Sequence, residues 1–204
     1  MLRSVSRAFA MAAVCITLIV PAALANPETE TFIQKNLDKG YTILNNMTLS
    51  DAQRREQFRA LLLGLAASRR IALFTLGSYA AGSPSDVVDN FVAAFTNYSI
   101  AIFEKGLSRY EGQTLKVTGS LDRAADDSLV QANLLSPSRP EPTKLTFRVR
   151  RTETGAPTIT DLLVDGVSLA TTERNDFLAY LQQHGGSIPE LAMRLNAMGD
   201  KPLN

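Results

Sequence analysis

The residue types that most often carry catalysis or bind metal ions are scarce in this sequence. The chain has 204 residues but only one cysteine, Cys15, and one histidine, His184. Zinc motifs and the facial triads of iron enzymes need two histidines or several cysteines, so this chain alone cannot build them. Asp161 and Asp165 could form a carboxylate pair for hydrolysis, but no second catalytic group accompanies them. The sequence therefore predicts no enzyme, no cofactor and no metal site.

The first 25 residues are typical of a secretory signal peptide. Two arginines accompany an apolar run over residues 8–20, and Ala23-Leu24-Ala25 matches the small-x-small cleavage site. Cleavage of residues 1–25 leaves residues 26–204, which is the length of one domain. Because Cys15 is removed with the signal, the exported chain has no cysteine, and disulfides and thiol chemistry are excluded.

The charge of the chain is nearly balanced, with 21 Lys and Arg against 20 Asp and Glu. Proteins that bind DNA or RNA usually carry a clear basic excess, so we expect no nucleic acid as a partner. One strand-like segment does carry a stripe of cations, Lys144, Arg148, Arg150 and Arg151. Alternation along a strand favours a solvated face for this stripe. Contact with lipid phosphates or with an acidic partner is the alternative.

Hydrophobic periodicity divides the domain into three regions. The N-terminal region has the period of helices and ends in a long helix that starts near Ser83 and Pro84 and is apolar nearly all round. After Gly112 the period changes to two, in four runs separated by short links, as in an antiparallel meander. Two helices close the chain, the second with a capping box at Ser187 and Glu190. This order predicts an α+β fold with N-terminal helices including one long buried helix, a four-stranded antiparallel curled sheet, and C-terminal helices.

Three blocks of residues stand in a fixed order along this chain. They are Leu76-Gly77-x-Tyr79 with Ser83-Pro84 and Phe91-x-Ala93-Ala94-Phe95; Tyr110-x-Gly112-Gln113-Thr114; and Asp161-x-x-x-x-Gly166-Val167-Ser168-Leu169 with Thr171-Thr172 and Asn175. In this order and spacing the blocks resemble the MlaC (toluene-tolerance) family of periplasmic phospholipid carriers. Residues 157–161 lack the aromatic residues that the family usually has there. The hopanoid-associated HpnM branch of the family is therefore an alternative.

The resemblance implies a periplasmic protein that holds lipid acyl chains in an apolar pocket, enclosed by the sheet and the C-terminal helices. It implies phospholipid as the ligand, or a hopanoid as the alternative. It also implies two partners, an ABC-type Mla complex in the inner membrane and a lipoprotein complex at the outer membrane. The candidate lipid-binding residues are apolar or aromatic residues of the long helix and the strands: Phe91, Phe95, Tyr98, Phe147, Val149, Leu162 and Val164. Filled core is the alternative for each of them, because a core needs the same residue types.

The energy of hydrocarbon in water explains why a lipid needs a carrier. At about 0.8 kcal/mol per CH₂, exposing a sixteen-carbon chain to water costs roughly 12 kcal/mol. A protein with a dry cavity removes this cost without any reaction chemistry. An exported interaction module without a ligand, and an exported hydrolase with an unrecognised site, remain as alternatives from the sequence.

Overall fold

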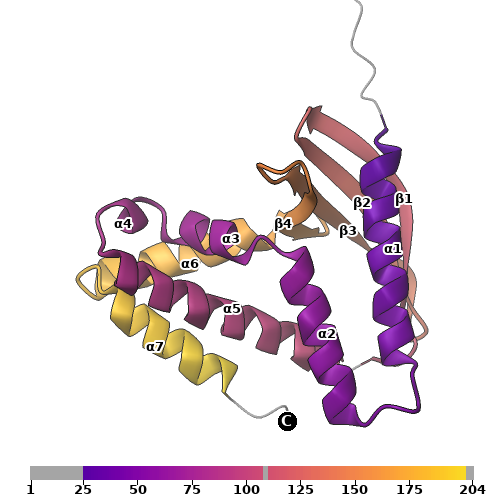
Figure 1. Ribbon diagram of the computed structural model, residues 1–204, viewed down its shortest axis with the longest axis horizontal. Coiled ribbons are helices and arrows are strands. Elements are labelled where there is room, and N and C mark those ends of the chain that lie inside the picture. Colours follow the sequence, from indigo (N-terminus) through magenta and orange to yellow (C-terminus); the bar gives the residue numbers. More distant parts are fainter. Residues whose placement is uncertain (1–24, 108–109, 201–204) are drawn as a thin grey trace, which may run out of the picture.

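The computed structural model describes residues 25–107 and 110–200, so the predicted signal segment lies outside the described residues except for Ala25. Helices come first, then a sheet, then helices, as predicted (Figure 1). The helices are α1 (Pro27–Leu44), α2 (Asp51–Leu65), α3 (Ser68–Leu76), α4 (Ser78–Ala81), α5 (Ser85–Leu107), α6 (Leu169–Gln183) and α7 (Ile188–Gly199). The strands are β1 (Thr114–Ala124), β2 (Asp127–Ser136), β3 (Arg139–Arg151), β4 (Pro157–Val164) and β5 (Val167–Ser168). Within these ranges no helix has both the length and the apolar character needed to cross a bilayer.

The five strands form one antiparallel sheet in the order β1-β2-β3-β4-β5. The prediction of four strands missed β5, which has two residues and is too short to show a period. β5 follows a turn at Asp165-Gly166, where φ is 48° and 87°. Positive φ at both residues is the requirement of a type I′ hairpin turn, and glycine adopts it at little cost. The strands twist without a strong curl (Figure 1), so the predicted curled sheet is not seen.

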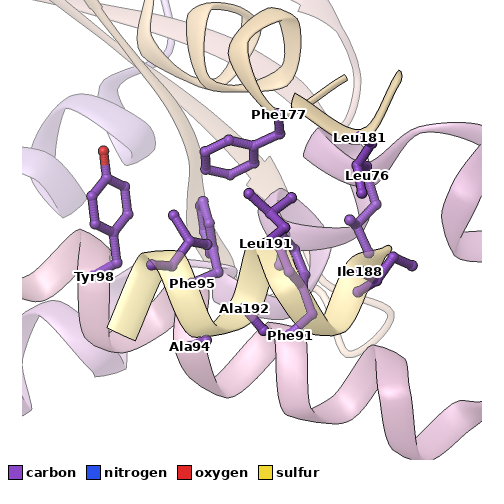
Figure 2. Packing of buried hydrophobic residues seen from close by; sticks show 12 residues of the cluster. Leu76, Phe91, Ala94, Phe95, Tyr98, Phe177, Leu181, Ile188, Leu191 and Ala192 are labelled. Atoms are coloured by element: carbon purple, nitrogen blue, oxygen red, sulfur yellow. The ribbon is translucent and has the colours of Figure 1, made fainter. Parts of the chain in front are cut away.

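A helical layer beside the sheet has its own aromatic core. α5 packs against α3 and α7, and α3 packs against α6. The rings of Phe91 and Phe95 in α5 stack at 6.2 Å, and the ring of Phe177 in α6 meets them edge-on at 6.1 and 6.2 Å. Figure 2 shows these rings beside Leu191 of α7. The end of α5 leaves this core, since Phe103 is 42% exposed.

The sheet has a second, smaller core that it shares with α1. Ile33 of α1 packs against Val130 and Val149 of the sheet. α1 lies along this face of the sheet, and α2 lies between α1 and α5 (Figure 1). None of the 15 residues of α2 is buried. The apolar residues Phe58, Leu61, Leu62 and Leu65 of α2 are only partly buried.

Candidate ligand-binding cavity

An apolar cavity of about 270 Å³ lies between α1, α2 and the sheet. α1 contributes the face that carries Leu37 and Tyr41, and α2 contributes the face that carries Phe58 and Leu62. Apolar residues recur every three to four positions on both helices, so each helix has one apolar side. Phe103 at the end of α5 and several inward residues of the sheet complete the wall. Four parts of the fold thus enclose the cavity.

A second cavity of about 130 Å³ lies between α2, α5 and the sheet. The residues that line both cavities are Leu62, Leu65, Phe103, Phe147, Ile159 and Leu162. We call the three sheet residues among them, Phe147, Ile159 and Leu162, the shared floor. Displacement of α2 would expose the shared floor and join the two cavities into one apolar groove.

Two polar side chains at the larger cavity, Tyr41 and Asn36, are engaged in hydrogen bonds within the protein. The backbone N–H of Leu115 donates to the hydroxyl of Tyr41, and burial raises the pKa of Tyr41 above its usual value. The side-chain amide of Asn36 donates to the carbonyl oxygen of Phe32 at 2.8 Å. A ligand in this cavity meets mainly carbon atoms, which matches a hydrocarbon chain.

Hydrogen bonds join α2 and the residues just beyond it to α5 and to β4. The Arg59 guanidinium donates to the side-chain oxygen of Asn97 in α5 at 2.8 Å, at an exposed position. At the end of α2, the Thr158 hydroxyl donates to the carbonyl oxygen of Leu65 at 2.9 Å. Just beyond it, the backbone N–H of residue 67 donates to the carbonyl oxygen of residue 159, also at 2.9 Å. The C-terminal end of α2 is thus fixed to β4. We call the Arg59–Asn97 hydrogen bond, which joins α2 to α5, the latch.

The structure divides the seven sequence-predicted lipid-binding residues between three places. Two of them belong to the shared floor: Phe147 and Leu162. Three lie in the helical core around α5: Phe91, Phe95 and Tyr98. Two lie on the sheet outside the lining of either cavity: Val149 and Val164. Lipid contact stays a prediction for all seven.

The C-terminal helices take a different place from the one expected. No residue of α6 or α7 lines either of these two cavities. Instead, Phe177 of α6 and Leu191 of α7 close the aromatic core around α5. The predicted enclosure of the pocket by C-terminal helices is therefore not seen here, and α1 and α2 provide the cover.

Sequence reasoning did not select the apolar faces of α1 and α2 as ligand contacts. The available signal was the helical period of Leu37, Tyr41 and Leu44 in α1 and of Phe58 and Leu62 in α2. Such a stripe predicts burial against another surface, whether that surface is filled core or cavity. Filled core and cavity differ in how closely the facing part of the protein packs against the stripe. The pattern of one helix carries no information about that distance.

The cationic stripe on β3 forms ion pairs at one end of the sheet. Arg148 donates to both carboxylate oxygens of Asp127, at 2.9 and 2.6 Å. These hydrogen bonds hold the pKa of Asp127 below its usual value. Two further arginines are paired in the same region, Arg150 with Asp126 and Arg151 with Glu28. The three arginines therefore tie the strand ends together and join β3 to α1.

Asp161 and Asp165, the conceivable carboxylate pair, are used by the fold. Asp161 accepts hydrogen bonds from the Ser168 hydroxyl at 2.6 Å and from the backbone N–H of Ala170 at 3.0 Å, which fixes the start of α6. Asp165 accepts from the backbone N–H of Lys144 at 2.9 Å. Within residues 25–107 and 110–200, no group of three or more His, Cys, Asp or Glu side chains could hold a metal ion.

A half-buried polar contact joins α5 to α6. The Tyr98 hydroxyl donates to Glu173 at 3.2 Å. Burial raises the pKa of Glu173 above its usual value, and the nearby charge of Asp176 raises it further. Burial, together with the charge of Glu173, raises the pKa of Tyr98 to about 12. Because the folded state binds the Glu173 proton more tightly than the unfolded chain does, this group lowers stability as pH rises through its folded pKa.

Glu173→Gln is expected to raise the melting temperature at pH 7 by about 1–3 °C, since glutamine keeps an acceptor for Tyr98 without the desolvated charge. The effect is small because solvent screens a half-exposed carboxylate. Calorimetry between pH 4 and 8 should show the gain disappearing toward pH 4, where glutamate is itself protonated. Glu153→Gln, at an exposed position, is the matched control. A lower melting temperature for Glu173→Gln at pH 7 would contradict the argument.

The fold is α+β, and it holds an apolar cavity between α1, α2 and the sheet. The family model described as MlaC protein matches residues 34–197, and the chain belongs to the MlaC family. The resemblance of the three sequence blocks is thereby confirmed. The prediction that the chain is not an enzyme agrees with this family, whose members are lipid-binding carriers. Membership of the HpnM branch stays a prediction.

A solved structure shares the fold. It is the phospholipid-binding protein from Ralstonia solanacearum in complex with a phospholipid. The two chains are 20% identical and superpose with a TM-score of 0.71, and the match covers 83% of this chain and 96% of that chain. At this level of identity the likeness concerns the arrangement of helices and strands.

Proposed function

We propose that this protein carries phospholipid through the periplasm, with the acyl chains held between α2 and the shared floor. The observation that carries the proposal is the apolar cavity, which lies beneath a helix that has no buried residue. Membership of the MlaC family and the phospholipid bound by the relative from Ralstonia solanacearum support it. The ABC-type Mla complex of the inner membrane and the outer-membrane lipoprotein complex are the proposed partners between which it carries lipid.

The size of the cavity indicates that loading requires movement. Its volume of about 270 Å³ is at the lower limit of small-molecule sites, which begin at roughly 300 Å³. A phospholipid with two long chains needs more room than this. We expect α2 to be the wall that moves most easily, because it has no buried residue and the latch that joins it to α5 is an exposed hydrogen bond. We therefore expect α2 to swing outward about its attachment to β4.

Identification of the bound lipid tests this function. The full chain is exported through its own signal, purified from the periplasm without detergent, and analysed by native mass spectrometry and lipid extraction. One phospholipid per chain is the expected result. Extraction of a hopanoid would instead assign the chain to the HpnM branch. A folded protein that is empty and takes up no lipid from phospholipid vesicles would contradict the proposal and favour an interaction module.

Removal of the latch should accelerate lipid exchange. Asn97→Ala deletes the acceptor of the Arg59 hydrogen bond, and an exposed hydrogen bond to a charged donor contributes on the order of 1 kcal/mol to the closed position of α2. Transfer of a fluorescent phospholipid from the protein to vesicles is expected to become about threefold to fivefold faster. Arg55→Ala, at an exposed arginine of the same helix, is the control. Unchanged transfer for Asn97→Ala would mean that the latch does not limit opening.

A further inference from the structure

Asn26, the residue that precedes α1, is bound to the sheet through its backbone and its side chain. Its backbone N–H donates to the Ser120 hydroxyl at 2.6 Å. Its side-chain amide donates to both oxygens of Asp122, at 3.0 and 3.1 Å, and to the Ser128 hydroxyl at 3.2 Å. Its side-chain oxygen caps α1 by accepting from the backbone N–H of Thr29 at 3.1 Å. The start of α1 is thus held by β1 and β2.

The surroundings of the Asn26 nitrogen are acidic. The Ser120 hydroxyl, which accepts from this nitrogen, donates in turn to the Glu30 carboxylate at 2.6 Å. Asp122 lies against the Asn26 side chain on the same strand as Ser120. Among the described residues, neither Glu30 nor Asp122 takes part in an ion pair. Each carboxylate thus lies one hydrogen-bonded group away from the Asn26 nitrogen, Glu30 through the Ser120 hydroxyl and Asp122 through the Asn26 side chain.

The same nitrogen follows the predicted signal cleavage site. Hydrolysis of the Ala25–Asn26 peptide bond by water, at a membrane peptidase, breaks the C–N bond and leaves a carboxylate on Ala25. The Asn26 nitrogen then changes from a neutral amide with one N–H into an ammonium group with three. The dipole of α1 disfavours a cation at its N-terminal end. Glu30 and Asp122 supply the negative charge that offsets this effect.

We propose that Ser120, Glu30 and Asp122 form a binding site for the α-ammonium group that signal cleavage creates, so that processing fastens α1 to the sheet. The Asn26 nitrogen already donates to one member of this site, the Ser120 hydroxyl, at 2.6 Å. Uncleaved precursor would gain only one uncharged hydrogen bond there, so its α1 is held less firmly. The further consequence, that processing completes one wall of the lipid cavity, rests on the proposed function, because α1 lines that cavity.

The inference carries a pH dependence with a defined sign. The charged groups near the ammonium are Glu28 and Glu30 of α1, Asp122 of β1, and Arg151 of β3, which is paired with Glu28 at 2.6 Å; the nearby β2 group is the neutral hydroxyl of Ser128. The excess of carboxylates should raise the pKa of the ammonium above its ordinary range of about 7.7–8.0. The stabilisation is then complete below about pH 7.7 and is lost as pH rises through the raised pKa.

Two forms of the full chain, both exported through the signal, provide the test. The first is the wild type, and the second has a glycine inserted between Ala25 and Asn26, so that processing leaves the ammonium up to about 3.6 Å further away. Intact mass identifies the cleaved bond in each form. After removal of lipid, ¹⁵N NMR titration gives the pKa of the terminal amine, and thermal unfolding from pH 6 to 10 gives the melting temperatures. Because the samples are lipid-free, the result does not depend on whether the protein carries lipid.

The expected result is an amine pKa above about 8.5 in the wild type and an ordinary value in the inserted form. The wild type should melt about 2–4 °C higher at pH 7, and the two forms should converge near pH 10. Glu30→Gln, made without the inserted glycine, should have a lower amine pKa than the wild type. This variant keeps a hydrogen-bond acceptor for Ser120. Cleavage at another bond, an ordinary amine pKa in the wild type, or equal melting temperatures at pH 7 would each overturn the inference.

Discussion

Phe147→Glu is expected to yield a folded protein that contains no lipid. Phe147 belongs to the shared floor, so its side chain faces both cavities. A carboxylate at this position either keeps its water, which prevents dry packing of an acyl chain, or loses it beside the chain. Either outcome makes lipid binding less favourable by several kcal/mol. The affinity for phospholipid should fall roughly 100-fold or more, because each 1.4 kcal/mol is a factor of ten. Native mass spectrometry of the exported variant measures the loss.

The neighbouring residue provides a closely matched control. Thr146 pairs with Gln131 and Leu163, and strand alternation places it on the opposite face of the sheet from Phe147. Thr146→Glu adds the same charge one residue away, outside the cavities, and should retain lipid. Equal loss of lipid in both variants would show that charge on β3 acts through stability. Full retention by a folded Phe147→Glu variant would place the acyl chains elsewhere.

Phe91→Ala is expected to lower stability strongly and to leave lipid content per folded molecule unchanged. Phe91 is fully buried, and its ring contacts Phe95 and Phe177 (Figure 2). Replacing a buried phenylalanine by alanine typically costs about 3–5 kcal/mol, because the cavity left behind is only partly refilled. That is a large fraction of the roughly 5–15 kcal/mol that stabilises a typical domain. Urea unfolding measures the loss of stability.

Phe103→Ala is the counterpart of this variant. Phe103 lines both cavities and is 42% exposed, so its truncation should cost little stability and should weaken lipid retention. The two variants together separate core from binding surface. Loss of lipid from folded Phe91→Ala would instead support the sequence-based prediction that Phe91 contacts the ligand.

Local signals in the sequence were sufficient for most of the fold. The capping box at Ser50 and Gln53 forms as predicted: the Ser50 hydroxyl accepts from the backbone N–H of Gln53, and the Gln53 side chain accepts from that of Ser50. Runs of apolar residues separated by polar or Pro/Gly links located the four long strands. The sequence did not predict β5, because its two residues are defined by the Asp165-Gly166 turn and by pairing with β4. Neither of these features produces a hydrophobic period.

The site was predicted less well, for a reason that Phe91 and Phe147 illustrate. Each was placed correctly on an apolar face, one on a helix and the other on a strand. The face of Phe91 packs against buried side chains of α6 and α7. The face of Phe147 lies beneath α2, which has no buried residue, and space remains. Whether an apolar face becomes filled core or cavity wall thus depends on how closely another helix packs against it. The hydrophobic period of one segment does not contain that information.

The carbon-lined wall of the cavity bears on which lipids such a protein would select. Each additional buried CH₂ contributes about 0.8 kcal/mol, which is close to a fourfold gain in affinity. Two polar groups that border the cavity, Tyr41 and Asn36, already have partners within the protein. Discrimination would therefore act on the length of the hydrocarbon tails far more than on the chemistry of the head group. The cargo would then mirror the fatty-acid composition of the membrane that supplies it, and would change as that membrane adapts to temperature.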